Sequence, residues 1–192
     1  MTEKKGVSGG RMKGVMSAGE MTAVLEEMGS AILDVCGEDP PRFVGILSRG
    51  VPLSHRLGRI VSSGEREISE YGELDIALYR DDFTEGGGDW PEVRGSRIPF
   101  DIAGKTIILV DDVLFTGRTI RAALNALMDY GRPKKVLLAV LIDRGGRELP
   151  IQADFVGKRI EVGEQDHVRV RLREVDGEDG VVIFQRRKGG EE

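Results

Sequence analysis

The sequence predicts a doubly wound α/β domain with a mainly parallel sheet, and three observations predict it. Short apolar runs alternate with segments of helical periodicity through the middle of the chain. The run from Val136 to Ile142 is apolar throughout, as expected of a parallel strand covered on both faces. The 192 residues are 40% hydrophobic and 32% charged, which suits one globular domain with a sizeable core.

We divide the chain into three parts. Residues 1–16 carry glycines and charges without periodicity, and we expect them to be disordered or loosely attached. Residues 17–187 form the domain, and residues 188–192 form a polar tail. No apolar signal segment or membrane-length run is visible and Cys36 stands alone, so we expect a cytoplasmic protein that contacts no membrane.

The first half of the domain has clear helix and strand patterns. Ser17 and Glu20 fit a capping box, and apolar residues then recur at helical spacing as far as Val35. The elements expected after this helix are a strand over 43–47, a helix over about 51–61 and a strand over 74–79. Residues 81–97 are rich in glycine and charge, so we expect a long, mobile functional loop.

The second half continues the alternation and then changes in texture. A short apolar strand is expected over 106–110 and a helix over 119–130, which Gly131 and Pro133 end. The strand over 136–142 follows. Beyond it the expected strands are shorter, at 154–156, 168–172 and 181–184.

The segment from Ile107 to Thr119 carries the clearest chemistry. An apolar strand ends in Asp111 and Asp112, and a short Thr-Gly turn leads into a helix. Ligands of open α/β sheets bind at the carboxyl ends of strands, and a helix N-terminus suits a phosphate. The two carboxylates suit sugar hydroxyls or Mg²⁺ rather than the phosphate itself. The alternative is an ordinary strand-turn-helix with an acidic turn.

This segment resembles the site for 5-phosphoribosyl 1-diphosphate (PRPP) in type I phosphoribosyltransferases. Resemblance over about residues 43 to 185 is narrower, to the PyrR family of pyrimidine-operon attenuation regulators that are also uracil phosphoribosyltransferases. The stretch from Arg144 to Lys158 is the part most specific to that family. The resemblance implies a type I phosphoribosyltransferase fold with a flexible lid loop and a small C-terminal hood.

The resemblance also implies the roles of individual residues. Asp111 and Asp112 would hold the ribose hydroxyls as catalytic residues together with Arg80, and would meet Mg²⁺ through PRPP. Arg80 begins the lid, whose Arg94 and Arg97 could reach the pyrophosphate. The residues implied for binding PRPP and the base are Ser48, Arg49, Gly50, Asp111, Asp112, Val113, Leu114, Phe115, Thr116, Gly117, Arg118, Thr119, Arg144 and Val168. For Val168, a strand residue facing the core is an equal alternative.

The implied reaction joins uracil and PRPP to give UMP and pyrophosphate. The family also implies control of pyrimidine genes through an RNA hairpin, sensed with UMP or UTP, and assembly into dimers or larger oligomers. Here the sequence departs from the family. Residues 26–31 read Glu-Glu-Met-Gly-Ser-Ala in a region where the family carries Arg and His, and Asp34, Gly146 and Gln152 stand where Arg or His is expected.

Two alternatives therefore remain. Arg147 and Lys158 are the basic residues kept at the RNA face, whereas a net charge of −5 argues against a generic nucleic-acid binder. One alternative is a protein that acts mainly as an RNA-binding attenuator. The other is a phosphoribosyltransferase that uses a different base, such as a purine or orotate.

Overall fold

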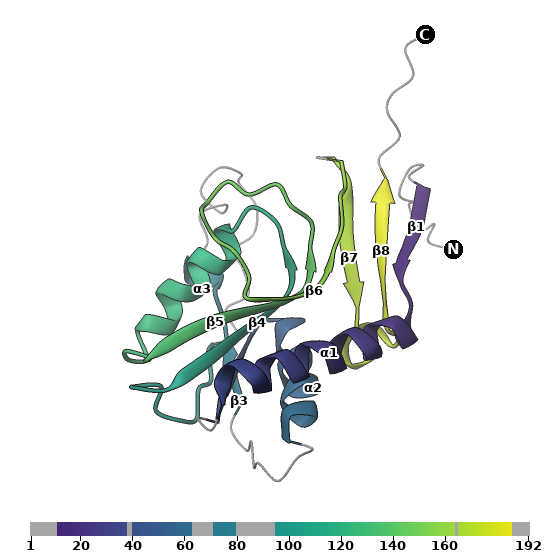
Figure 1. The fold of residues 1–192 in the computed structure, drawn as a ribbon. Helices are drawn as coiled ribbons and strands as arrows, with labels where there is room; N and C mark the ends of the chain where they lie inside the picture. The colour runs from purple at the N-terminus through teal and green to yellow at the C-terminus, as the bar shows by residue number, and fades with distance from the viewer. Residues whose placement is uncertain (1–10, 38–39, 63–70, 80–94, 164, 186–192) are drawn as a thin grey trace, which may run out of the picture.

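The computed structural model describes residues 11–37, 40–62, 71–79, 95–163 and 165–185. Two sheets organise these residues (Figure 1). The larger sheet is parallel and has the strand order β3-β2-β4-β5-β6. The smaller sheet is antiparallel and has the order β1-β8-β7. The predicted α/β fold with a mainly parallel sheet is confirmed, and the smaller sheet is the hood.

The strands of the larger sheet are β2 (Arg42–Ile46), β3 (Tyr71–Leu74), β4 (Thr106–Leu114), β5 (Lys135–Asp143) and β6 (Phe155–Arg159). The three long helices are α1 (Ala18–Cys36), α2 (Gly50–Ser62) and α3 (Arg118–Met128). The hood consists of β1 (Arg11–Met16), β7 (His167–Arg171) and β8 (Gly180–Gln185), with the short helix α4 (Arg173–Asp176) between β7 and β8.

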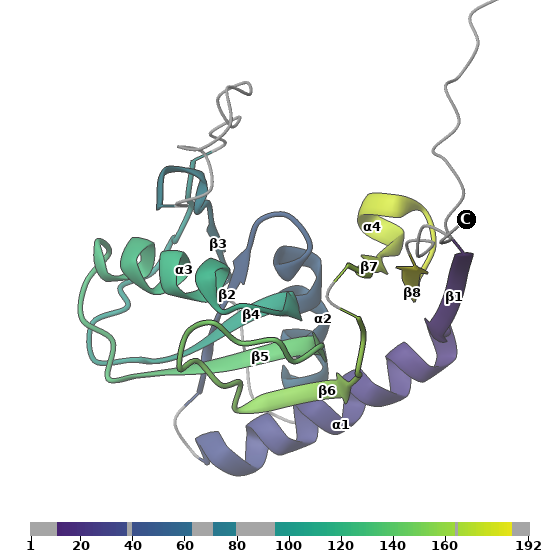
Figure 2. The ribbon, with the colours of Figure 1, turned by 90° about the horizontal axis from the view of Figure 1, so that it is seen from above.

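Helices cover both faces of the larger sheet. Helices α1 and α2 lie on one face and α3 on the other (Figure 2). The buried side chains accordingly form two clusters, one with Leu25 and Leu57 and the other with Ile120 and Leu127. The hood shares the first cluster, because Met16, Val170, Leu172 and Val181 pack in it. The hood is therefore held to the domain on the side of α1 and α2.

The start of α1 is as its sequence predicts. The Ser17 amide donates to Oε2 of Glu20 over 2.7 Å, and the Glu20 amide donates to Oγ of Ser17 over 3.3 Å. This reciprocal capping box satisfies two backbone donors that the helix itself leaves unpaired. It fixes the point at which the chain leaves β1 and enters the helix.

Residues 1–16 were expected to be disordered or loosely attached, and the structure corrects this expectation for residues 11–16. These residues form β1, which pairs with β8 from Arg11 opposite Gln185 to Met16 opposite Val181. Met16 is buried and contributes to the core, so order begins before Ser17. The pairing partner lies at the far end of the chain, where local periodicity gives no sign of it. Residues 1–10 and 186–192, which include the predicted tail, lie outside the described residues.

A second correction concerns the strand expected over 74–79. Strand β3 begins at Tyr71 and ends at Leu74, and residues Ala77–Tyr79 form the 3₁₀ helix η1. The side chain of Asp75 accepts a hydrogen bond from the Ala77 amide, and this turn diverts the chain from the sheet.

Among the described residues, no helix is both long enough and apolar enough to cross a bilayer.

Candidate active site

Three loops meet at one edge of the larger sheet. They follow the parallel strands β2, β4 and β5, which are neighbours, so their carboxyl ends share this edge. The loops carry Ser48–Gly50, Phe115–Gly117 and Arg144–Arg147. The structure thus brings together the predicted PRPP residues and Arg144 in the position where open α/β sheets bind ligands.

Glycines allow the turn after β2 to lie against β4. A Cβ atom on Gly50 would stand 2.3 Å from the carbonyl oxygen of Val110, and one on Gly45 would stand 2.5 Å from the carbonyl oxygen of Gly50. Both distances are shorter than any ordinary contact. Because of these two distances, only glycine lets the Ser48–Gly50 turn approach the strand that carries the acidic pair. The peptide bond between Leu47 and Ser48, at the start of the turn, is cis.

The acidic pair lies within β4, which continues to Leu114 instead of ending at Val110 as predicted. The strand is longer because β5 pairs with it as far as Leu114 opposite Asp143. Asp111 is 6% exposed, and its Oδ1 accepts the Asp112 amide over 2.9 Å. Asp112 is half-buried; this burial raises the pKa of its carboxyl group, and the positive charge of Arg49 partly opposes the rise.

The turn after β4 leaves the start of α3 open. Gly117, with φ at +91°, stands at the N-cap position, and no side chain caps the helix. Nearby, the Arg118 amide donates to Oγ1 of Thr116 over 3.3 Å. An uncapped helix start presents backbone N–H groups and the positive end of the helix dipole. Phosphate oxygens are the ligands that such a turn binds best.

The loop after β5 is fixed to this turn. The amides of Glu148 and Leu149 both donate to the carbonyl oxygen of Thr116, over 3.0 and 3.1 Å. Arg147 adds hydrogen bonds from Nη1 to the carbonyl oxygen of Phe115 over 2.8 Å and from Nε to that of Ile151 over 3.0 Å, and an ion pair with Asp143 at 2.6 Å. These bonds set the shape of the turn from outside it.

Arg144 lies beside the turn and is 9% exposed. Its guanidinium group is 4.0 Å from the centroid of the Phe115 ring and donates to the carbonyl oxygens of Asp166 and Gly163 over 2.8 and 3.0 Å. Burial lowers the pKa of Arg144, although the charge of Asp166 opposes the shift. Since its Nε is buried without a hydrogen-bond partner, this side chain keeps an unused donor within the site.

Comparison with known proteins assigns the chain to a family. Residues 15–172 match the model of the phosphoribosyl transferase domain. The bifunctional protein PyrR of Thermus thermophilus is 51% identical over 173 residues, which are 90% of this chain and 95% of that protein. The PyrR of Chloroflexus aurantiacus is 49% identical over 183 residues, 92% of this chain and 97% of the relative. The chain belongs to the PyrR family.

Solved structures agree on the fold of this PyrR-family chain. A hypoxanthine phosphoribosyltransferase from Staphylococcus aureus superposes with a TM-score of 0.68 at 18% identity, over 94% of both chains. One from Trypanosoma cruzi gives a TM-score of 0.67 at 19% identity, over 91% of both chains. These likenesses concern the fold, which is that of the type I phosphoribosyltransferases.

The other predicted residues of the PyrR-family chain have mixed surroundings. Val168 is paired with Ile183 in the hood and packs against the core cluster, as its structural alternative requires. Nζ of Lys158 donates to the carbonyl oxygen of Val15 over 2.9 Å. Arg147 is engaged both in its own loop and with the turn after β4, as described above. An RNA contact by Lys158 or Arg147 therefore stays a prediction, and both side chains already serve the fold.

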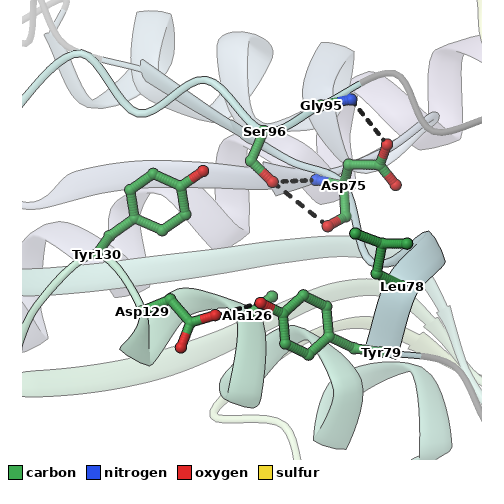
Figure 3. A pocket seen from close by; sticks show the side chains of 8 residues that line it. All are labelled: Asp75, Leu78, Tyr79, Gly95, Ser96, Ala126, Asp129 and Tyr130. Atoms are coloured by element: carbon green, nitrogen blue, oxygen red, sulfur yellow. Dashed lines mark hydrogen bonds between the residues drawn. The ribbon is translucent and has the colours of Figure 1, made fainter.

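Most of the predicted lid lies in residues 80–94, which are outside the described residues. Arg80 and Arg94 are the first and last residues of that range. Its flanks are described. Asp75 accepts the Gly95 amide over 3.0 Å through Oδ2, and its own amide donates to Oγ of Ser96 over 2.8 Å (Figure 3). Arg97 pairs with Glu73 through two backbone hydrogen bonds of 2.8 Å. The segment thus leaves and re-enters the domain at one place beside β3.

A pocket of about 230 Å³ opens beside these flanks. Figure 3 shows Tyr79 of η1 reaching Asp129 at the end of α3, where its hydroxyl donates to the carboxylate. The pocket is lined by Asp75, Leu78, Tyr79, Gly95, Ser96, Ala126, Asp129 and Tyr130. None of these is a predicted PRPP residue, so this pocket is distinct from the site at the strand ends.

The structure adds contacts that sequence reasoning missed. Arg49 is paired with Asp176, and Arg56 with Glu174 and Asp179, across the junction of α2 and the hood. The acidic character of residues 174–179 was visible in the sequence. Its partners were not, because they lie more than a hundred positions away.

Proposed function

We propose that this chain is a uracil phosphoribosyltransferase of the PyrR type, which converts uracil and PRPP to UMP and pyrophosphate. One observation carries the proposal. Buried Asp111 and half-buried Asp112 stand a few residues before an uncapped helix start and beside the Ser48–Gly50 turn. This arrangement offers acceptors for a sugar next to donors for phosphate, and PRPP needs both.

The residues divide the substrate among them. Carboxylate oxygens of Asp111 and Asp112 accept hydrogen bonds from the ribose 2′- and 3′-hydroxyls. The N–H groups that begin α3, with the hydroxyls of Thr116 and Thr119, bind the 5′-phosphate. Arg49 meets the pyrophosphate through charge-assisted hydrogen bonds. The sugar is thereby held at three points, which orients its C1′ atom for transfer.

The transfer needs no covalent enzyme intermediate. The bond from C1′ to the pyrophosphate oxygen breaks as the uracil nitrogen approaches, and positive charge develops on the sugar. The nitrogen bonds to C1′ and its proton is released to water, while pyrophosphate leaves with the electron pair of the broken bond. The carboxylates of β4 stabilise this charge, while Arg49 stabilises the negative charge on the leaving group. Arg80, which the family resemblance implies as a further catalytic residue, is proposed to act on the same leaving group.

Mg²⁺ fits the donors present. Asp111 and Asp112 supply hard carboxylate oxygens, whereas the described residues contain no group of three or more His, Cys, Asp or Glu side chains that could hold a metal alone. Such a site matches Mg²⁺, which is commonly bound by one or two carboxylates together with substrate phosphates. When bound through PRPP, the ion neutralises charge on the departing pyrophosphate.

The base is the decisive test of the proposal. Arg144, with its unused Nε donor, and the backbone of the hood near Val168 are proposed to meet the pyrimidine. Purified protein is incubated with PRPP, Mg²⁺ and one of uracil, hypoxanthine, guanine or orotate, and pyrophosphate release is measured. We expect release with uracil only. Release of pyrophosphate with only a purine or only orotate would identify that base, and not uracil, as the substrate. No release with any of the four bases would reject the proposed enzymatic activity.

A second role, RNA attenuation, is implied by membership of the PyrR family, and the relatives are named bifunctional. The face that would serve it is weakly basic here. Glu26 and Glu27 are exposed on α1. At position 146, where the family has histidine, a Cβ atom would stand 2.4 Å from the Phe115 ring, so a side chain there requires the ring to move. Each missing phosphate contact removes a counterion-release contribution, and each acidic residue adds repulsion. We therefore propose that hairpin binding is weaker in this chain.

Titration with a pyrimidine-leader hairpin, with and without UMP or UTP at fixed salt, tests this role. We expect weak binding that depends little on the nucleotide, because few phosphate contacts remain. Tight UMP-dependent binding would instead make RNA regulation the principal function. Replacing both Glu26 and Glu27 with Gln is a useful comparison, since it removes the repulsion without altering the site at the strand ends.

A further inference from the structure

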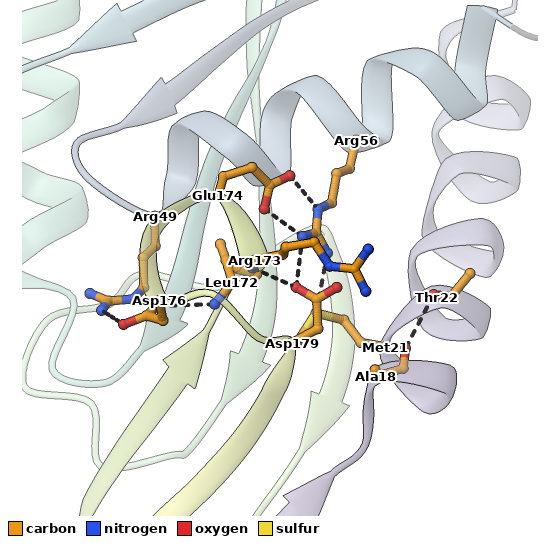
Figure 4. A network of polar contacts seen from close by, with 10 residues as sticks. All are labelled: Ala18, Met21, Thr22, Arg49, Arg56, Leu172, Arg173, Glu174, Asp176 and Asp179. Atoms are coloured by element: carbon orange, nitrogen blue, oxygen red, sulfur yellow. Dashed lines mark hydrogen bonds and ion pairs between the residues drawn. The ribbon is translucent and has the colours of Figure 1, made fainter.

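The junction between α2 and the hood is built from two sets of ion pairs. Arg49 lies just before α2 and pairs with Asp176 at the end of α4 (Figure 4). Two turns along the helix, Arg56 pairs with Glu174 at 2.5 Å and with Asp179 at 2.7 Å. Both arginines therefore tie the same helix to the same hood, but Arg49 alone belongs to the proposed substrate site.

The pair formed by Arg49 and Asp176 has the geometry of a two-pronged contact. Nη2 of Arg49 donates to Oδ1 over 2.8 Å, and Nε donates to Oδ2 over 3.2 Å. The side chains are 23% and 12% exposed. Two parallel bonds to one planar carboxylate fix the orientation of the guanidinium plane as well as its position.

Asp176 is itself fixed by the hood. Its Oδ2 also accepts the Leu172 amide over 3.0 Å, and Nη2 of Arg169 lies 3.7 Å from Oδ1. Leu172 is fully buried in the core cluster that the hood shares with α1 and α2. The position of the Asp176 carboxylate is thus fixed by the hood, and the carboxylate does not move independently on the surface.

The remaining edge of the Arg49 guanidinium group is available to a ligand. In the described structure Nη1 makes no hydrogen bond, and Asp176 uses only the edge formed by Nε and one Nη2 hydrogen. The turn that carries Arg49 also packs against the strand of the acidic pair, because a Cβ atom on Gly50 would lie 2.3 Å from the carbonyl oxygen of Val110 and 3.4 Å from Cα of Asp111. Arg49 is therefore bonded to a carboxylate of the hood and adjoins the segment of the sheet that carries Asp112.

We infer that Asp176 is a positioning residue that holds Arg49 toward the pyrophosphate group of PRPP and away from Asp112. The inference rests on the proposed function and deepens it. Without Asp176, Arg49 loses the contact that orients it, and Asp112 becomes the nearest carboxylate of the site to attract it. Both effects weaken PRPP binding, because Asp112 is then less available to the ribose hydroxyls. Uracil binding depends on neither residue.

The test compares two variants of the same junction. Asp176→Asn removes the charge that orients Arg49, whereas Glu174→Gln weakens the neighbouring pair and leaves Arg56 bonded to Asp179. We expect Asp176→Asn to raise the KM for PRPP by about tenfold and to leave the KM for uracil within about twofold. Glu174→Gln should leave both values within about twofold. Thermal melting of both variants measures any loss of hood stability.

A double-mutant cycle with Arg49→Lys shows whether Asp176 acts through Arg49. Lysine keeps the charge but cannot form the two-pronged contact. Arg49→Lys alone should raise the KM for PRPP, and adding Asp176→Asn should change it little further, since the pair acts as a unit. If Asp176→Asn does not fold, Arg49→Lys still decides, because a wild-type KM for PRPP in that variant overturns the inference.

Three further results would also overturn it. They are an equal effect of Asp176→Asn and Glu174→Gln on both KM values, full additivity in the cycle, and a lower KM for PRPP in Asp176→Asn. Calorimetric titration of Mg²⁺ and PRPP into wild type and Asp176→Asn separates this inference from the proposed function. Equal PRPP affinity in the two proteins rejects the role of Asp176 alone, whereas absence of binding to wild type rejects the proposed function.

Discussion

At the scale of single residues, the site depends on three charged side chains that influence one another: Asp112, Arg49 and Asp176. Asp112 is driven toward a raised pKa by burial, and Arg49 opposes that rise. Arg49 is in turn held by Asp176. The hydrogen bond that Arg49 donates lowers the pKa of the Asp176 carboxyl group. Each member therefore sets the charge state or direction of the next.

Replacement of the acidic pair tests the sugar contact. Asp111→Asn or Asp112→Asn should lower kcat/KM for PRPP by roughly 10- to 100-fold each, because a charged acceptor for a hydroxyl contributes about 1.5–3 kcal/mol. Steady-state kinetics with varied PRPP measures the loss. Asp101→Asn is the matched control, since Asp101 is exposed and its only described bond, from the Ala103 amide, can be kept by Asn. Unchanged kinetics in both site variants would refute the ribose contact.

Gly50 tests the close approach of the turn to β4. Gly50→Ala places a Cβ atom against the Val110 carbonyl oxygen, which is backbone and cannot rotate away. We expect a loss of about 1–3 kcal/mol in the free energy of unfolding together with weaker PRPP binding. Gly19→Ala is the control, because nothing lies within 4 Å of its added Cβ. Equal melting temperatures for the two variants would show that the turn can relax.

At the scale of elements, the capping box, the apolar runs and the glycines predict the helices and strands better than the composition of the loops predicts the loops. Ser17 and Glu20 locate the start of α1 correctly, and the apolar run at Val136–Ile142 lies within β5. The end of β4 was placed too early, because aspartates are poor strand formers and only the pairing with β5 extends the strand through them. Tertiary pairing there overrides local propensity.

The hood could be predicted only in part. Its strands β7 and β8 follow from alternation in the sequence, whereas the bond between Arg49 and Asp176 joins residues 127 positions apart. No local pattern specifies which of several nearby acids Arg49 selects. The turn between β4 and α3 was predicted well for the opposite reason, since its strand, glycine and helix are consecutive in the chain.

Acid should loosen the junction of the hood with α2 before it affects the larger sheet. The pKa values of Asp176 and Glu174 are lowered chiefly by hydrogen bonds from Arg49 and Arg56, and that of Asp179 is lowered overall by Arg56 and the Arg173 amide despite its burial. Groups with depressed folded pKa values stabilise the fold above their unfolded values, about 3.9–4.3. That contribution is lost as the pH falls through the folded values.

Hydrogen-exchange protection factors measured at pH 6 and at steps below pH 4 test this prediction. We expect protection in β7 and β8 to fall first, while β4 and β5 keep theirs. The doubly substituted variant Glu174→Gln with Asp179→Asn provides the control, because it should show low hood protection already at pH 6. Simultaneous loss across both sheets would show that the junction does not determine acid sensitivity.

At the scale of the whole molecule, the core is shared between the domain and the hood. Met16 of β1 is 4% exposed and packs in the same cluster as α1 and α2. Met16→Ala should lower the free energy of unfolding by about 2–5 kcal/mol, as expected for truncation of a buried methionine. Chemical denaturation monitored by circular dichroism measures the change.

Met12→Ala is the control for this truncation. Met12 lies in the same strand but is 55% exposed, so the same substitution should cost less than about 1 kcal/mol. A comparable loss in both variants would mean that β1 contributes through strand propensity alone. A loss in neither would mean that the hood is held without β1.

The pairing of β1 with β8 has a consequence for how the protein is made. The strands of the larger sheet lie between Arg42 and Arg159, so all of them are synthesised before β8. Strand β1 emerges first yet must wait for Gly180–Gln185 before its edge finds a neighbour. During translation the strands of the larger sheet are therefore synthesised while β1 still lacks the neighbour that holds it in the hood.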